Sequence, residues 1–344
     1  MSKIELVPYE NHFFESYQQF AWRNWGKGTY KADQNYLNWL YKENPSVNKS
    51  KMDFLIATVD GKDVVGSIHK MRAFWRINNE EVEIPAIHNL LVDKKYQSGY
   101  GLFLITSSLK GHEHIFVPAV ADPISEVYEK LHCQRLDVFW YRKVLNPVAA
   151  TTGYLLNKHF KMITHKKYFN EKWQIKSPEF KVTINPSFEI LSKIVKTLRK
   201  RNSGYNVHPA WDEVWLKWRF FHKIGPKHLL IFSERGEDLD FLILSLGPRH
   251  GLNTCRIIEA SVENSALMKK MLKAIEKMLK KNGIQLFLVF TADPKLNNNL
   301  VQNGWQPLKN TPKTFIYHKN KKEQFSNYAF NALVGDFGLE SIEK

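Results

Sequence analysis

The stretch from Val92 to Gly101 combines the residue types that hold a phosphate group. An apolar run of β type leads into a turn that contains two glycines, and a segment of helical pattern follows. Backbone N–H groups at the start of a helix bind anions, because they point at the ligand and carry the positive end of the helix dipole. Lys94 and Lys95 add positive charge, and Gly99 and Gly101 would allow a close approach of the backbone. The stretch predicts a pyrophosphate site, although an ordinary turn or cap also uses glycines in this way.

Two ionisable side chains on the strand before this turn are candidates for acid–base chemistry. His88 lies just before the turn, and Glu83 lies further back on the same strand. Histidine changes its charge near neutral pH and is the most frequent general base in enzymes. His88 is therefore the first candidate for a general base, and Glu83 is the second. The alternative for His88 is a half-buried strand histidine whose hydrogen bonds are satisfied.

Other reactive groups lack the spacing that their chemistry needs. Cys133 and Cys255 are the two cysteines of the chain, and they form neither a disulfide framework nor a zinc-binding pattern. Neither lies in a context typical of a nucleophile. The thirteen histidines show no metal-ligand spacing with cysteines or carboxylates, and His112-Glu113-His114 is too close-set for a helical zinc pair. We expect no metal site.

Composition limits the class of protein. The chain of 344 residues has room for two domains, and a hydrophobic content of 43% allows a substantial core. No apolar run approaches the roughly 20 residues that span a bilayer, and the first residues lack the apolar core of a signal peptide. With few cysteines, these features favour a cytoplasmic protein. The formal net charge of +16 favours an anionic partner, such as a nucleotide-bearing coenzyme, tRNA or a membrane surface, or else reflects a solvated, lysine-rich surface.

Hydrophobic periodicity predicts strands and helices along the whole chain. In the first part we expect strands at 4–8, 54–59, 64–68, 82–92, 115–120 and 135–144, and helices at 11–25, 36–41, 102–109 and from the N-cap Asp122. In the second part we expect helices at 154–163, 188–198, 211–221, 264–282 and after Asp293, and strands at 229–232, 241–246, 254–260, 284–290 and 314–318. This pattern indicates an α/β protein.

The two parts share landmarks that indicate a repeat. The aromatic stretch 36–41 is similar to 215–220, and Asp122-Pro123 and Asp293-Pro294 each follow a predicted strand. Two copies of one fold in tandem explain these matches, although matches as loose as these also arise by chance. We expect one domain at 1–146 and another at 183–344, with a connector at 147–182.

Each half resembles the acyl-CoA-dependent N-acyltransferase fold of the GNAT superfamily. The resemblance rests on the strand, turn and glycines of 87–101, on 122–131 as the late helix with its serine and tyrosine, and on the Tyr-Leu-x-Trp stretch ahead of Asn44-Pro45 that some bacterial tandem members carry. It covers most of the chain and is specific from about residue 50 to 145. It implies two tandem GNAT-like domains of the α/β (α+β) class, each with a mixed, mostly antiparallel central sheet flanked by helices.

The resemblance also implies a coenzyme A site in the first half. The superfamily turn reads Gln/Arg-x-x-Gly-x-Gly/Ala, whereas one residue fewer separates Gln97 from Gly99 here, so that Tyr96 stands at the Gln/Arg position. The pantetheine arm is expected along the strand that ends at Val92. Tyr128 stands where the superfamily places the residue that protonates the sulfur, and a core tyrosine is the alternative. The residues expected to bind the coenzyme are Leu90, Leu91, Val92, Gln97, Ser98, Gly99, Tyr100, Gly101 and Ser125, and those expected in catalysis are Tyr128, His88 and Glu83.

The second half lacks a comparable turn. Its stretch 257–264 leads into a long helix without a glycine pair and carries two acidic residues, Glu259 and Glu263. Carboxylates repel a pyrophosphate, so we expect this half to bind no coenzyme and to complete the fold or wall the acceptor pocket. Glu259 either faces that pocket or forms a structural ion pair.

These observations predict an N-acyltransferase of the GNAT type. It would move an acetyl or other acyl group from acetyl-CoA or another acyl-CoA to a primary amine of a small acceptor, such as a sugar nucleotide or another metabolite, as a monomer or homodimer. One alternative is an aminoacyl-tRNA-dependent transferase similar to the Fem-like peptidyltransferases of cell-wall synthesis, which share the doubled fold; no other nucleic acid is expected. The other alternative is a non-catalytic protein that binds CoA or another ligand.

Overall fold

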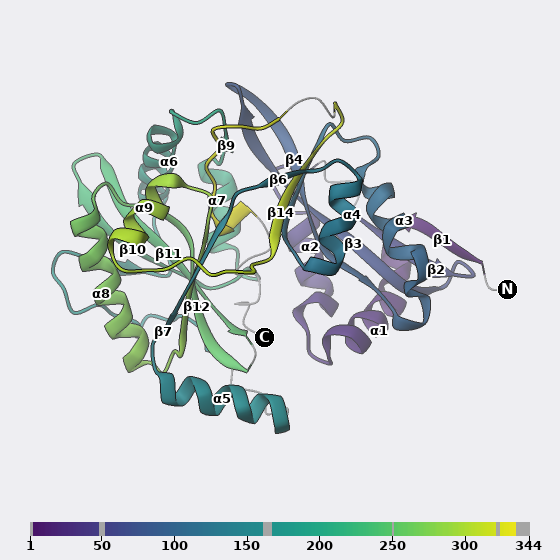
Figure 1. Cartoon of the computed structure of the whole chain (residues 1–344), viewed down its shortest axis with the longest axis horizontal. Helices are drawn as coiled ribbons and strands as arrows, with labels where there is room; N and C mark the ends of the chain where they lie inside the picture. Colours follow the sequence, from purple (N-terminus) through teal and green to yellow (C-terminus); the bar gives the residue numbers. More distant parts are fainter. Residues whose placement is uncertain (1–2, 48–51, 161–166, 250, 321–323, 335–344) are drawn as a thin grey trace.

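The protein is built on two mixed β-sheets, each covered by helices on both faces (Figure 1). A computed structural model describes residues 3–47, 52–160, 167–249, 251–320 and 324–334. Within these residues the first sheet has eight strands and the second has six. The expected mixed α/β architecture is therefore confirmed, because each sheet combines antiparallel pairs with one parallel pair.

The first sheet is formed mainly by the N-terminal half. Its strand order is β1 (Ile4–Pro8), β2 (Phe54–Val59), β3 (Asp63–Ile77), β4 (Glu80–Val92), β5 (His114–Val120), β14 (Lys313–His318) and β6 (Gln134–Leu136), with β9 (Val207–Pro209) paired to β3. Helices α1 (Phe14–Trp25) and α2 (Gln34–Tyr41) pack on one face. Helices α3 (Gln97–Leu109) and α4 (Asp122–Lys130) pack on the other face.

The second sheet repeats this plan with the C-terminal half. Its strand order is β7 (Phe139–Val144), β13 (Leu286–Thr291), β12 (Leu252–Ser261), β11 (Asp238–Arg249), β10 (His228–Arg235) and β8 (Lys181–Thr183). Helices α6 (Phe188–Asn202) and α7 (Glu213–Phe221) pack on the face toward the first sheet, and α8 (Ser265–Lys281) and α9 (Pro294–Gln302) cover the opposite face. The parallel pair β12–β13, followed by α9, corresponds to β4–β5 followed by α4, which supports a tandem repeat.

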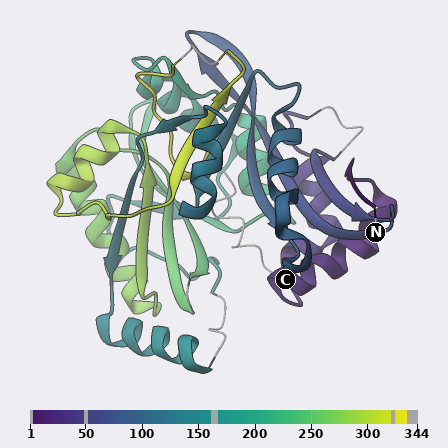
Figure 2. The same cartoon turned by 45° about the vertical axis from the view of Figure 1, so that its right-hand side comes forward.

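The two halves exchange strands. The predicted closing strand 135–144 is in fact two strands, and this correction changes the topology: β6 lies at the edge of the first sheet, whereas β7 pairs with β13 of the second. In return, β14 near the C-terminal end pairs with β5 and β6 of the first sheet (Figures 1 and 2). The proposed domain boundary at residue 146 stays a prediction, and main-chain hydrogen bonds cross it in both directions.

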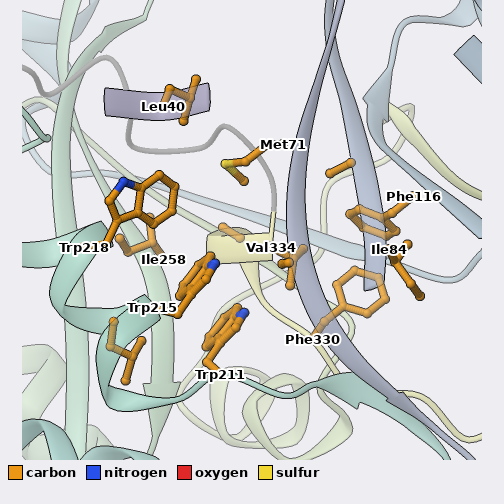
Figure 3. Packing of buried hydrophobic residues seen from close by; sticks show 14 of the residues in the cluster. Leu40, Met71, Ile84, Phe116, Trp211, Trp215, Trp218, Ile258, Phe330 and Val334 are labelled. Atoms are coloured by element: carbon orange, nitrogen blue, oxygen red, sulfur yellow. The ribbon is translucent and has the colours of Figure 1, made fainter. Parts of the chain in front are cut away.

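A single apolar core joins the two halves. Trp215 and Trp218 of α7 and Ile258 of β12 face Met71 of β3 and Phe116 of β5 across it (Figure 3). The segment 329–334 fills the space between them, with Phe330 against the rings of Trp75, Phe116 and Phe290 at centroid distances of 5.8, 5.1 and 6.3 Å. Because this core draws on both halves, the interface has the character of a protein interior and not of a surface contact.

Local signals account for most element ends. Asn264 and Asp293 accept hydrogen bonds from Leu267 and Lys295, as N-caps do. The prediction for Asp122 was wrong, because the N-cap is Ala121 and Asp122 is already the first helical residue, without a side-chain cap bond. Helix α5 (Pro147–Phe160) lies earlier than the predicted 154–163, whose end is outside the described residues.

Strand exchange predicts that neither half is stable alone. The fragment 1–146 lacks β14, and with it the side chains of Phe315 and Ile316, which are 0% and 1% exposed. Removing two such side chains costs about 3–6 kcal/mol, which approaches the whole stability of many domains. Urea unfolding of 1–146 followed by circular dichroism should show no cooperative transition, and adding the fragment 147–344 should restore one. A cooperative transition of 1–146 alone would contradict the proposed dependence.

Candidate functional site

Strands β4 and β5 open a gap in the first sheet. Within the described part of the chain they pair at Ala86 and Phe116, and β4 continues to Val92 without β5 beside it. On its other side β4 stays paired with β3, up to Val92 opposite Gly66. The backbone of Leu90, Leu91 and Val92 therefore has an edge that no strand of the described residues occupies. An extended ligand with amide groups can hydrogen-bond to such an edge in the manner of an added strand.

A β-bulge lies beside this gap. Two residues of β4, Asn89 and Leu90, oppose one residue of β3, because the register shifts between the pairs His69–His88 and Ser67–Leu91. Asn89 has a φ of +52°, a left-handed conformation that asparagine tolerates better than most residues. Bulges bend a strand and redirect its side chains, and they are frequent near active sites. The bulge places Leu90 toward α3 and Leu91 toward the core between the halves.

The glycine-containing turn opens helix α3 earlier than predicted. A short 3-10 helix, Lys94–Tyr96, leads directly into α3 at Gln97, so Gly99 and Gly101 both lie in the first turns of the helix. Gly99 has a φ of +83°, which a residue with a side chain rarely adopts, and a Cβ atom at either glycine would meet open space. The N-terminal end of α3 therefore presents its backbone to solvent at the end of the β4–β5 gap.

Two residues of α1 fix the start of this turn. Arg23 donates to Asp93 Oδ2 at 2.9 Å, and Asn24 donates to Asp93 Oδ1 at 2.6 Å. Gln97 Nε2 bonds the Val92 carbonyl at 3.4 Å, and Tyr100 is half-buried against the α3 side of the sheet. The part of Gln97, Ser98, Gly99, Tyr100 and Gly101 in coenzyme binding stays a prediction, and the Ser98 side chain lies outside the described residues.

His88 belongs to a buried chain of hydrogen bonds that sequence reasoning missed. The chain runs from Tyr17 of α1 to His69 Nε2 (3.2 Å), from His69 Nδ1 to the Tyr41 hydroxyl of α2 (2.6 Å), and from there to His88 Nε2 (3.3 Å). His88 Nδ1 meets the Asn89 amide at 3.0 Å. His69 and His88 are 1% and 7% exposed. The contacts join residues up to 52 positions apart, so spacing along the sequence does not reveal them.

The amide of Asn89 determines the tautomer of His88. Lys31 contacts the Asn89 Oδ1 atom, and an ammonium group can only donate. The amide NH₂ of Asn89 therefore faces His88 Nδ1, which must be the accepting nitrogen, and the proton lies on Nε2 toward Tyr41. His88 is neutral in this arrangement. Its Nδ1 lone pair points at the bulge, next to the β4–β5 gap.

Burial controls the protonation of this chain. Burial lowers the pKa of His69 well below its usual range, and the nearby His88 and Lys31 lower it further. Burial raises the pKa of Tyr17 well above its usual range, and Tyr9, which packs against Tyr17, has a pKa raised to about 12. His69 and both phenols are therefore uncharged near neutral pH.

Tyr128 and Ser125 lie on the opposite face of the first sheet. Tyr128 is 2% exposed and stacks on Phe315 of β14 at 5.8 Å. Burial, followed by the neighbouring Cys133, raises the pKa of Tyr128, so its hydroxyl keeps its proton near neutral pH. Ser125 donates to the Asp122 carbonyl at 2.8 Å and receives Lys313 at 3.2 Å. Both residues follow β5 on α4, on the far side of the gap from α3.

The structure does not bring Glu83 to this place. Glu83 pairs with Arg72, which also binds Asp53, and five residues of strand separate it from His88, a length of about 16 Å. A structural ion pair accounts for its position. Its carboxylate is paired and far from His88, which does not favour a role as a base. The catalytic role of Glu83 stays a prediction from the sequence.

In the second half, the chain itself occupies the corresponding gap. Strands β12 and β13 pair from Thr254 to Ile257 and then separate. The segment around Asn331 fills the opening: Asn331 bridges to Thr291 of β13, and its amide donates to Glu259 of β12. Glu259, fully buried, also pairs with Arg201 at 2.9 Å, so the structural alternative for this residue is confirmed.

A small cavity lies beside the start of α8. It measures about 120 Å³ and is lined by Arg201, Arg235, Asp240 and Asp293, among others. Pockets that hold a drug-sized ligand measure about 300–1,000 Å³. This cavity is therefore too small for a coenzyme.

Comparisons with known proteins identify the fold. Protein-family models and curated proteins give no match. Solved structures do: N-myristoyltransferase of Saccharomyces cerevisiae with bound myristoyl-CoA is 11% identical, with 92% of this chain and 83% of that chain covered at a TM-score of 0.62. A GCN5-related N-acetyltransferase from Kribbella flavida is 11% identical over 92% and 71% of the two chains, with a TM-score of 0.57. A probable N-acyltransferase from Enterococcus faecalis V583 is 10% identical over 92% and 73%, with a TM-score of 0.56.

The chain therefore has a tandem GNAT-like fold. This conclusion rests on coverage of 92% of the chain by these structures at TM-scores of 0.56 to 0.62, and it confirms the resemblance seen in the sequence. Among the described residues, no helix is both long enough and apolar enough to cross a membrane.

Buried histidines predict acid sensitivity. The pKa values of His69 and His228 lie well below the usual range, mainly because of burial. Below about pH 6.5 each of these histidines binds a proton in the unfolded chain but not in the folded chain. Their contribution to the free energy of unfolding is therefore fully present above that pH and is lost as the pH falls. Each histidine lowers the free energy of unfolding by up to about 1.4 kcal/mol per pH unit. Urea unfolding between pH 7 and 5 measures this slope. His69→Gln should reduce it and the exposed His12→Gln should not; equal slopes would contradict the assignment.

Proposed function

We propose that the protein is an acyl-CoA-dependent N-acyltransferase whose coenzyme site lies in the first half. The observation that carries the proposal is the gap between β4 and β5, which opens beside a bulge and ends at the exposed N-terminus of α3. A pantetheine arm has two amide groups that suit the free edge of β4, and a pyrophosphate suits the helix start with Lys94 and Lys95 beside it. The similar fold of structures that hold myristoyl-CoA supports an acyl-CoA as the cosubstrate.

The reaction requires two proton movements. A neutral primary amine attacks the thioester carbonyl, the C–N bond forms and the C–S bond breaks, so the amine loses a proton and the sulfur gains one. We assign His88 Nδ1 as the atom that takes the proton from the amine. The amine substrate would displace the Asn89 amide from this nitrogen. Tyr128, kept protonated by burial, is the proposed donor to the sulfur. Tyr41 and His69 hold the His88 ring and its tautomer, so they act as positioning residues.

The acyl group and the acceptor are part of the same proposal. An acetyl group is the proposed acyl group, with a longer acyl chain as the alternative, and a small amine is the proposed acceptor. An aminoacyl-tRNA-dependent transferase is the second candidate, favoured by the net charge of +16. Against it, the gap and glycine-containing turn of the first half are features that a coenzyme would use.

Coenzyme binding should depend on the helix start. Acetyl-CoA or a longer acyl-CoA at a hundred times its dissociation constant should stabilise the protein by about 2.7 kcal/mol, measured as a thermal shift. Gly101→Leu should weaken binding at least tenfold, because the side chain would stand over the N–H groups of α3 without a clash inside the protein. Gly204→Leu is the matched control, since a Cβ there also meets open space. No shift with any acyl-CoA would overturn the proposal and leave the tRNA-dependent or non-catalytic alternatives.

The histidine–tyrosine chain should control turnover. His88→Gln should lower kcat by about 10²–10⁴-fold, the usual contribution of a general base, with little change of KM for acyl-CoA. Tyr41→Phe removes the hydrogen bonds of the hydroxyl to His69 and His88. It should lower kcat less, about tenfold, and shift the pH profile of kcat, because the His88 ring loses the tyrosine contact at Nε2. The kcat values of both variants are measured as acyl transfer to a panel of amines, detected through the release of free thiol. An unchanged kcat in His88→Gln would leave His88 a structural residue.

A further inference from the structure

We propose that Glu113, His114 and His318 bind a divalent transition-metal ion of the zinc type. One ligand atom of each residue, a carboxylate oxygen or a ring nitrogen, lies within 4.8 Å of those of the other two. The trio lies at the end of β5 and β14, on neither wall of the β4–β5 gap, so the proposal is independent of the proposed acyl transfer. It revises the expectation from the sequence, where His318 is too far from 112–114 to suggest a ligand set.

The exchanged strand brings the two histidines together. His318 of β14 lies directly opposite His114 of β5 in the antiparallel pair, so both side chains project from the same face of the sheet. Their rings are nearly perpendicular, with an interplanar angle of 80° and centroids 4.4 Å apart. The next hydrogen bond, from the Lys319 N–H to the Glu113 carbonyl at 2.8 Å, holds the backbone of the third ligand.

The surroundings prepare His318 as a ligand. Its Nδ1 lies 2.7 Å from the Asn320 carbonyl oxygen, which can only accept a hydrogen bond. The ring proton is therefore on Nδ1, and Nε2 keeps the lone pair that a metal ion uses. A carbonyl that orients the ligating ring in this way is typical of protein metal sites and raises the basicity of the ligand.

Burial and charge also favour a cation. His114 and His318 are 8% and 5% exposed, and Phe325 packs on both rings at centroid distances of 5.4 and 5.8 Å, which shields one side of the trio from water. Glu113 is exposed and free to turn toward the rings, and its carboxylate offsets part of the charge of the ion. Two imidazoles and one carboxylate suit Zn²⁺ and leave a fourth position for water.

A bound ion would reinforce the strand exchange. It would connect β5, in the first half of the chain, with β14, which enters the same sheet from the C-terminal end. Metal that binds only the folded chain stabilises it, because the ligands come together only on folding. The proposed role of the ion is therefore structural: it links the two halves and stabilises the folded chain.

Cobalt provides a spectroscopic test. The full chain, freed of metal with a chelator, is titrated with Co²⁺, and the visible absorption bands of tetrahedral cobalt are followed. We expect these bands at a stoichiometry of about one, their removal by Zn²⁺, and a rise in melting temperature with either ion. Absence of the bands in the unaltered protein would overturn the proposal.

Variants separate this site from stray binding. Glu113→Gln keeps the fold because the residue is exposed, and it should weaken cobalt binding at least tenfold; His318→Gln should abolish the bands. The exposed His12→Gln and Glu129→Gln are the matched controls and should leave the titration unchanged. Circular dichroism checks the fold of His318→Gln. Unchanged cobalt affinity in Glu113→Gln, together with unchanged bands in His318→Gln, would show that the trio does not bind the ion.

Discussion

The pairing of β14 with β5 and β6 is the interaction on which the rest of this structure depends. It places a strand from the C-terminal end inside the first sheet, while β7 completes the second. Both halves then share one core, in which the tryptophans of α7 meet the inner face of the first sheet (Figure 3). The same pairing brings Phe315 against Tyr128 and His318 against His114. A fold built in this way cannot lose one half without damage to the other.

The two halves share one arrangement of strands and helices, but the gap in their sheets differs. In each, the strand before a helix leaves its parallel neighbour and then carries a bulge, at Asn89 in β4 and at Ile258 in β12. In the first half the opening ends at an exposed helix start. In the second it is filled by the segment around Asn331 and closed by the buried pair of Glu259 and Arg201. The difference supports the proposal of a coenzyme site in the first half alone.

Sequence reasoning located the strand, the turn and the helix of the candidate site, because those features depend on short-range physics. An apolar run of β type marks β4, and a glycine such as Gly99 is favoured where the backbone becomes left-handed. The same reasoning missed Tyr41 and His69, which meet His88 from another helix and another strand. It also placed Glu83 in the site, because the sequence shows that Glu83 and His88 share a strand but not where along that strand the gap begins.

The sequence by itself determined the elements, the repeat of their order and the fold that this order implies. Periodicity, caps and turns are read within a few residues, so they survive without knowledge of the partner segments. Only the tertiary structure decided which sheet receives each strand. The stretch 135–144 has the pattern of one strand, yet it divides between the two sheets, because its hydrogen-bond partners β14 and β13 lie far away in the sequence. The histidine–tyrosine chain and the trio at the end of β14 follow from that decision, because their members meet only when hydrogen-bonded strands and packed helices fix the long-range contacts.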